Sequence, residues 1–133
     1  MNFVQDKHVS VNVFVKINDG PENLKAHQDL IKIAIADAKN CPGVLYFNFS
    51  YKTDQDGTQR AFGRQGFKDG TSLVNYHKET IGKVQGWEKI CQLEKMQCHC
   101  TKEEWEVVKE EMAPFGAEFW EITDFGCQNT NVQ

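Results

Sequence analysis

The stretch VSVNVFVKI, residues 9–17, decides the fold of this chain. Valine or isoleucine occupies every second position, and the positions between hold Ser10, Asn12, Phe14 and Lys16. This alternation is typical of a half-buried β-strand, whose neighbouring side chains point to opposite faces of a sheet. We therefore expect the aliphatic side of the strand to pack against helices, and Asn12 to point away from them.

The rest of the chain alternates between strand-like and helix-like patterns. An Asp19/Glu22 capping pattern and apolar residues at helical spacing predict an amphipathic helix, which Cys41-Pro42-Gly43 stops. Thr101 and Glu104 form a second capping pattern further along. The predicted elements are, in order, a strand over 9–17, a helix over 21–39, strands over 44–51 and 60–67, a helix opening at 69–72, a short helical piece over 87–91, a strand over 96–101, a helix from Thr101 that Pro114 and Gly116 end, and a strand over 117–123.

This β-α-β-β-α-β order, followed by α-β, predicts an α+β fold of the ferredoxin-like type, an antiparallel sheet with helices on one face. We expect one domain over 1–133, with a core over 8–100, a helix–strand extension over 101–125 and a polar tail over 126–133. Two helices cover only one face of such a sheet. Either the extension or a second copy of the chain must cover the other face.

Composition excludes several classes of protein. The 133 residues are 40% hydrophobic and 26% charged, as in an ordinary soluble domain. Fifteen Lys and Arg face nineteen Asp and Glu, and no basic stretch reaches three residues, which argues against a nucleic-acid partner. The sequence has no apolar run long enough to span a membrane and no signal-peptide pattern. We therefore expect a cytoplasmic protein without a membrane partner.

The five cysteines do not resemble a disulfide framework, because their number is odd and the chain is large. Cys98-His99-Cys100 is the one pattern that resembles a metal site. It lies in a predicted strand, so the two thiols share one face and His99 points to the other. We therefore expect buried thiols and no bound metal.

Two further motifs resemble a known family. The run CPGVLYF at 41–47 resembles the start of the second strand in antibiotic-biosynthesis-monooxygenase-like proteins, and FKDGTSLVNYH at 67–77 resembles their junction between the third strand and the second helix. The resemblance spans roughly residues 8–100. It implies a dimeric α/β barrel in which two sheets pair face to face around a common interior. A homodimer is therefore expected, with an interface of well over ~2,000 Å².

The resemblance implies a cofactor-independent monooxygenase acting on a small apolar or aromatic substrate in the barrel interior. The alternative is a non-catalytic or uncharacterised barrel that binds a small ligand. Phe67 stands where heme-degrading members carry tryptophan, and residues 82–87 offer no histidine for an axial ligand. Neither heme nor any other cofactor is therefore expected.

The expected catalytic residues are His77 and Asn12. His77 occupies the family's common histidine position and would act as a base, because imidazole titrates near neutral pH. Asn12 would hold a substrate oxygen in the space between the sheets, with His77 at the edge of that space. The Glu-rich face over 103–111 is expected to be solvated. Expected substrate-binding residues, each with packing or an edge ion pair as its structural alternative, are Asn48, Arg64, Phe67, Tyr76, Trp87 and Trp120.

Overall fold

The alternating strand β2 (Val9–Ile17) lies at the centre of a five-stranded sheet with the order β3-β4-β2-β5-β6. The computed structural model describes residues 3–4, 6–125 and 127–129. Its other elements are β1 (Phe3–Val4), α1 (Pro21–Asn40), β3 (Val44–Thr53), β4 (Gln59–Phe67), α2 (Gly70–Thr80), the 3-10 turns η1 (Ile81–Lys83) and η2 (Trp87–Lys89), β5 (Cys91–Cys100), α3 (Lys102–Met112), η3 (Ala113–Phe115), β6 (Glu118–Glu121) and β7 (Gln128–Asn129).

The sheet has the predicted ferredoxin-like core with one strand added at its edge. Strands β2, β3, β4 and β5 pair antiparallel, and β6 pairs parallel to β5. The parallel pairing follows from topology, because the chain leaves β5, passes through α3 and returns in the same direction. The C-terminal extension therefore widens the sheet. It does not cover the open face.

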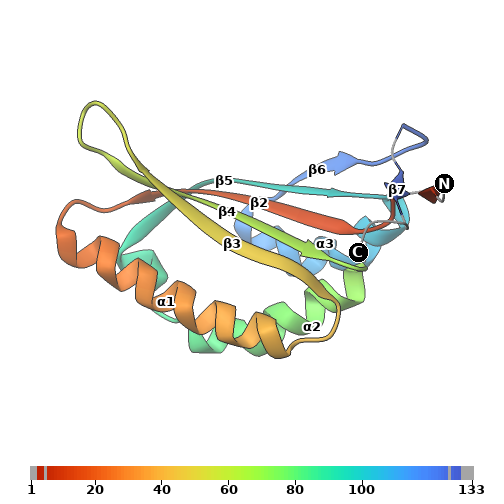
Figure 1. Ribbon diagram of the computed structural model, residues 1–133, viewed down its shortest axis with the longest axis horizontal. Coiled ribbons are helices and arrows are strands. Elements are labelled where there is room, and N and C mark those ends of the chain that lie inside the picture. The colour runs from red at the N-terminus through yellow and green to blue at the C-terminus, as the bar shows by residue number, and fades with distance from the viewer. Residues whose placement is uncertain (1–2, 5, 126, 130–133) are drawn as a thin grey trace.

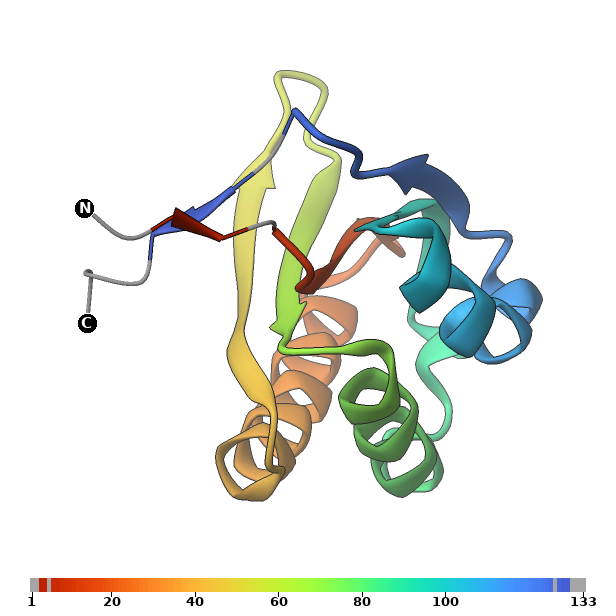
Figure 2. The ribbon, with the colours of Figure 1, turned by 90° about the vertical axis from the view of Figure 1, so that its right-hand side faces the viewer.

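Within the described residues, the helices α1, α2 and α3 lie on the same side of the sheet (Figures 1 and 2). The aliphatic side chains of β2 point toward them and are at most 7% exposed. The α3 helix packs beside α2, where its Val108 is fully buried. None of the described helices lies over the opposite face, to which Asn12 and Phe14 belong. The expected orientation of the central strand is confirmed.

Two of the three described α-helices begin with a side-chain cap. The carboxylate of Asp69 accepts from Ser72 N at 2.9 Å and caps α2, and the hydroxyl of Thr101 accepts from Glu104 N at 3.3 Å and caps α3. The Asp19/Glu22 capping box predicted for α1 is wrong, since Gly20 is the N-cap and no side chain caps this helix.

Two strand boundaries also differ from the prediction. Strand β5 begins at Cys91, before the predicted start at residue 96, because it pairs along β2 from Ile17 onward. In the predicted polar tail, Gln128–Asn129 pairs with Phe3–Val4 as a two-stranded ribbon. The rest of the tail, apart from residue 127, lies outside the described residues. Backbone pairing between the two ends of a chain leaves no local sequence pattern.

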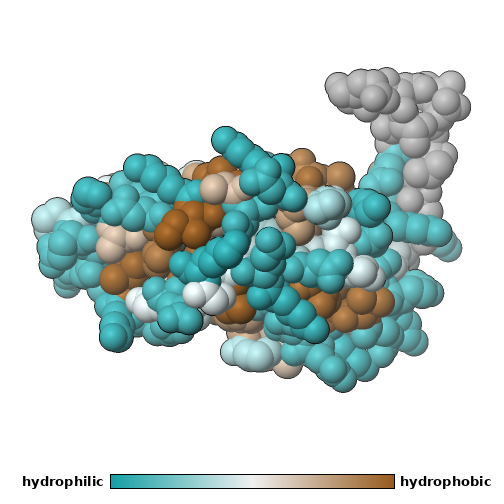
Figure 3. All heavy atoms as spheres, turned by 90° about the horizontal axis from the view of Figure 1, so that it is seen from below, coloured by the Kyte–Doolittle hydropathy of each residue, from teal (hydrophilic) through white to brown (hydrophobic). Residues whose placement is uncertain are grey.

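The helix side of the molecule is mostly hydrophilic, with separate apolar patches between the polar side chains (Figure 3). Exposed aliphatic residues on this side include Ile33 of α1 and Val107 of α3. No helix in the described part of the chain combines the length and hydropathy needed to cross a membrane.

Candidate functional site

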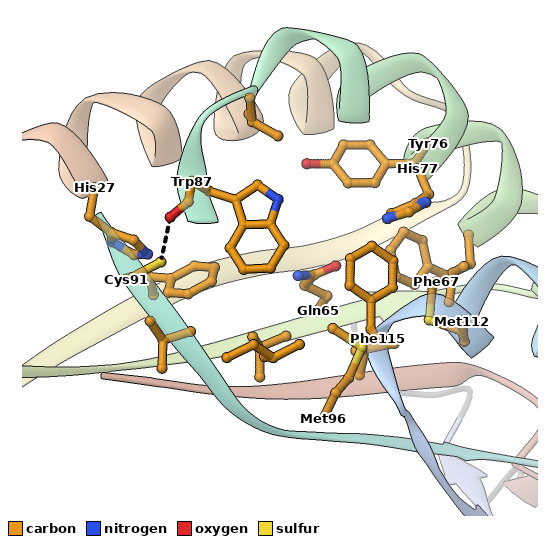
Figure 4. A pocket seen from close by; sticks show the side chains of 17 residues that line it. His27, Gln65, Phe67, Tyr76, His77, Trp87, Cys91, Met96, Met112 and Phe115 are labelled. Atoms are coloured by element: carbon orange, nitrogen blue, oxygen red, sulfur yellow. Dashed lines mark hydrogen bonds between the residues drawn. The ribbon is translucent and has the colours of Figure 1, made fainter. Parts of the chain in front are cut away.

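A cavity of about 170 Å³ lies between the helices and the aliphatic face of the sheet (Figure 4). A cavity of similar size in another protein holds a benzene ring. Valines of β2 form part of its wall, and the remaining lining is mostly apolar. Besides Val11, Val13 and Val15, the lining comprises His27, Phe49, Gln65, Phe67, Leu73, Tyr76, His77, Val84, Trp87, Cys91, Leu93, Met96, Met112 and Phe115.

An imidazole–carboxylate pair lies at one end of this cavity. His77 Nδ1 is 2.8 Å from Glu111 Oε2, and the two side chains are 22% and 21% exposed. The ring of Phe115 packs edge-on against the imidazole, with 5.1 Å between ring centroids. An ionised carboxylate only accepts, so a neutral imidazole in this contact carries its proton at Nδ1 and has its lone pair at Nε2. Glu111 thus fixes the tautomer that a general base needs.

A single amide faces the apolar wall of the cavity. Gln65 of β4 lies opposite Val11 of β2 and Phe47 of β3 in the strand register. Its side chain points into the cavity (Figure 4). It makes no hydrogen bond to any residue that the structure describes. A polar group without a protein partner in such a wall is available to a ligand or to water.

A second imidazole lies at the other end of the cavity. His27 of α1 is only 4% exposed, and its Nδ1 is 2.9 Å from the Tyr51 hydroxyl. The rings of Phe49 and Tyr51 meet the imidazole edge-on. Burial lowers the pKa of His27 and raises that of Tyr51 to about 12, so both groups are neutral near pH 7. This end of the cavity therefore carries a neutral hydrogen-bonded pair, His27 and Tyr51.

The other polar groups in the lining are engaged or poorly reactive. The Tyr76 hydroxyl donates to Ala34 O at 2.9 Å, and burial raises its pKa. The Cys91 thiol donates to Trp87 O at 3.3 Å, and burial raises its pKa to about 11, so it is a weak nucleophile at neutral pH.

The rings of Trp87 and Phe115, with centroids 6.5 Å apart, also line an adjoining surface groove of about 670 Å³.

The structure does not bring Asn12 and His77 together. Asn12 faces the open side of the sheet, whereas His77 lines the cavity on the helix side. The expectation that both border the space between two sheets is therefore wrong for His77. The physical reason is the direction of α2, whose buried face carries His77 toward the valine side of the sheet.

The six expected substrate-binding residues also divide between the two faces of the sheet. Phe67, Tyr76 and Trp87 line the cavity. On the open face, the Arg64 guanidinium lies 5.3 Å from the centroid of the Tyr46 ring, and Trp120 is 50% exposed while stacking on His99. The exposed Asn48 pairs with Arg64 in the register.

Two polar residues of the cavity wall, Gln65 and His27, and the carboxylate beside the cavity, Glu111, were not predicted as site residues. Glu111 was assigned to a solvated face, but the approach of α2 to α3 half-buries it against His77. Gln65 and His27 carry a weak signal in the sequence, because each is a polar residue on an otherwise apolar strand or helix face. Such a residue is often satisfied by its surroundings, so the signal alone does not identify a site.

The Cys98-His99-Cys100 run is arranged as its alternation predicts. The two thiols are fully buried on the helix side, with 4.0 Å between their sulfur atoms, and His99 faces the other way. Among the described residues, no three His, Cys, Asp or Glu side chains converge as metal ligands.

Comparison with known proteins finds similar structures but no match by sequence. No protein-family model matches the sequence, and no curated protein matches it. The crystal structure of MupZ from Pseudomonas fluorescens superposes with a TM-score of 0.79 at 19% identity, covering 96% of this chain and 99% of MupZ. At this coverage, the likeness includes the C-terminal extension.

Two shorter structures share the core. A dimeric ferredoxin-like protein from an uncultured marine organism has a TM-score of 0.56 at 13% identity, covering 73% of this chain and 97% of its own. SnoaB, a cofactor-independent oxygenase from Streptomyces nogalater, has a TM-score of 0.54 at 10% identity, covering 73% and 95%. The chain therefore has the ferredoxin-like fold that SnoaB and the dimeric marine protein also have, as the family resemblance implied.

Proposed function

We propose that the helix-side cavity is the active site of a cofactor-independent monooxygenase that acts on a small aromatic or apolar substrate. The observation that carries the proposal is the 2.8 Å contact between His77 and Glu111 at one end of the apolar cavity. The fold shared with SnoaB, a cofactor-independent oxygenase, supports the class of reaction. Proton abstraction is the step of such a reaction that requires a basic side chain.

His77 would abstract the proton. In the tautomer fixed by Glu111, Nε2 accepts a proton from a phenolic or enolic hydroxyl of the substrate. The imidazolium that forms is stabilised by the Glu111 carboxylate, as in other His–carboxylate pairs. The apolar lining favours reaction of the resulting anion with O₂, since molecular oxygen is itself apolar and needs no charged pocket.

The oxygen chemistry balances without an added reductant. The substrate anion gives one electron to O₂, and the two radicals combine to form a carbon–oxygen bond. A proton returned by His77 completes the hydroperoxide, and loss of water leaves a carbonyl. In the overall change, a CH₂ group and O₂ become C=O and H₂O. The amide of Gln65, which points into the cavity, would donate to the developing peroxide oxygen.

The alternative is a barrel that binds a small ligand without turnover. The mostly apolar lining supports this alternative, because pockets of this kind bind through buried apolar surface and use few polar groups for orientation. It predicts saturable binding of small aromatic molecules with no oxygen consumption.

The decisive experiment measures oxygen uptake with a panel of electron-rich monocyclic phenols, without added metal or flavin. The ¹⁸O₂ label should appear as one atom in the product and one in water. Glu111→Gln should lower kcat by about 10²-fold with little change in KM, because it loosens the base without altering the cavity wall.

The matched control is Glu110→Gln on the exposed side of α3, which should leave both constants unchanged. An unchanged kcat in the Glu111 variant would contradict the role given to the pair. Saturable binding of the panel without oxygen uptake would favour the ligand-binding barrel.

We further propose that a second copy of the chain covers the open face of the sheet. The helices α1, α2 and α3 lie on the opposite side. The open face carries aromatic residues such as Phe14 and Phe62, whose ring centroids are 4.9 Å apart. Phe62→Glu should convert the dimer to monomer in sedimentation velocity. Ile33→Glu, at an exposed site on the helix side, should leave the dimer intact.

A further inference from the structure

The cavity has a polar pair at each end, and only one of the two has a role in the proposed proton abstraction. His27 and His77 lie at opposite ends, with Trp87 and Gln65 between them (Figure 4). His27 is 4% exposed on a helix face that otherwise carries apolar side chains. Burying an imidazole costs more free energy than burying an apolar side chain of similar size. A histidine at this position therefore favours a role in binding a ligand.

The hydrogen bond to Tyr51 decides what His27 offers to the cavity. The Tyr51 hydroxyl lies 2.9 Å from His27 Nδ1 and has no other partner among the described residues. When this hydroxyl donates to Nδ1, its proton is satisfied within the protein. A neutral imidazole that accepts at Nδ1 must carry its proton at Nε2. His27 thus presents an N–H donor, the reverse of the acceptor that His77 presents.

We infer that His27 binds a carbonyl oxygen of the substrate, and that the substrate is a conjugated hydroxy-carbonyl compound that spans the cavity. The inference rests on the proposed function. When His77 removes the proton from the hydroxyl at one end, the negative charge moves through the conjugated ring to the carbonyl oxygen at the other. The N–H of His27 stabilises that oxygen without transferring a proton.

The uncharged state of His27 suits this role. A neutral imidazole donates a hydrogen bond but does not give up its proton readily, so the carbonyl oxygen remains an anion that can pass an electron to O₂. The edge-on contacts with Phe49 and Tyr51 hold the plane of the ring. The ring is therefore oriented before a ligand arrives, which is the condition under which such donors stabilise charge well.

Two probes of nearly equal shape test the inference. 4-Hydroxyacetophenone carries the carbonyl oxygen, and 4-ethylphenol replaces it with hydrogen atoms. Calorimetry with the wild-type protein should show that the ketone binds about tenfold more tightly, as expected for one buried hydrogen bond. The infrared carbonyl stretch of the bound ketone should move to lower frequency than in an apolar solvent.

His27→Phe should abolish both the preference and the infrared shift while keeping affinity for 4-ethylphenol. Tyr51→Phe keeps the ring of the tyrosine and removes only the hydroxyl that fixes the imidazole, so it should weaken both readouts even if the His27 variant folds poorly. The matched control is Tyr46→Phe, on the opposite face of the same strand, which should change neither.

Binding of both probes with equal affinity, or an infrared shift retained in the His27 variant, would overturn the inference and leave the proposed function standing. Failure of both probes to bind the wild-type protein would overturn the proposed function and the inference together. The two failures are therefore distinguishable.

Discussion

Replacing Gln65 by leucine should stabilise the protein and impair the proposed reaction. The amide faces an apolar wall and has no hydrogen bond to a described residue. The Gln65 side chain is half-buried, so its amide loses part of its hydration and costs less than the about 1–3 kcal/mol of a fully buried polar group without a partner. Leucine has a similar volume and needs no partner. We therefore expect the free energy of unfolding to rise by about 0.5–1 kcal/mol.

The size of the chain converts this gain into a measurable shift. At about 2.1 cal/mol/K per residue, unfolding of 133 residues has an entropy of about 0.28 kcal/mol/K near the midpoint. The Tm of Gln65→Leu should therefore rise by about 2–4 °C in calorimetry. Turnover with a phenolic substrate should fall on the order of 10²-fold, because one oriented donor is lost.

Gln55→Leu, at an exposed position in the turn between β3 and β4, controls for the added apolar side chain and should leave both quantities unchanged. A lower Tm in Gln65→Leu would refute the reasoning, because it would mean that the amide has a stabilising partner in the unliganded protein.

Three other measurements test the fold and its charges. Gly70→Ala should destabilise the protein by about 1–3 kcal/mol in urea unfolding, because a Cβ there would lie 2.9 Å from Val108 Cγ1; an unchanged midpoint would mean that α2 and α3 separate easily. Tyr76→Phe should cost about 0.5–1.5 kcal/mol through loss of the hydrogen bond to Ala34, with a wild-type value as the contrary result. Burial lowers the pKa of His27 in the folded protein below 6.5, so the unfolded chain takes up the proton first as the pH falls. The free energy of unfolding should therefore decrease below about pH 6.5, by at most about 1.4 kcal/mol per pH unit. A His27→Gln variant with the same dependence of stability on pH would contradict this assignment.

The family resemblance and the element order were predictable because they depend on local patterns. The alternation over 9–17 gave the orientation of the central strand, and Thr101 gave the start of α3, since strand faces and helix caps are set by residues close in sequence. The position of β6 was not predicted, because the order of the elements left open whether the extension widens the sheet or covers its open face. The ribbon between residues 3–4 and 128–129 was not predicted either, because its pairing joins the two ends of the chain.

The candidate site shows the same division. The sequence by itself identified His77 as a candidate base and placed Asn12 on the face away from the valines. Only the tertiary structure separated the two residues onto opposite sides of the sheet, paired His77 with Glu111 and set Gln65 between two imidazoles. These contacts join residues from α1, α2, α3 and β4, and their geometry depends on how the helices pack across the sheet. Local sequence patterns determine which face a side chain takes, whereas packing between distant elements determines which side chains meet.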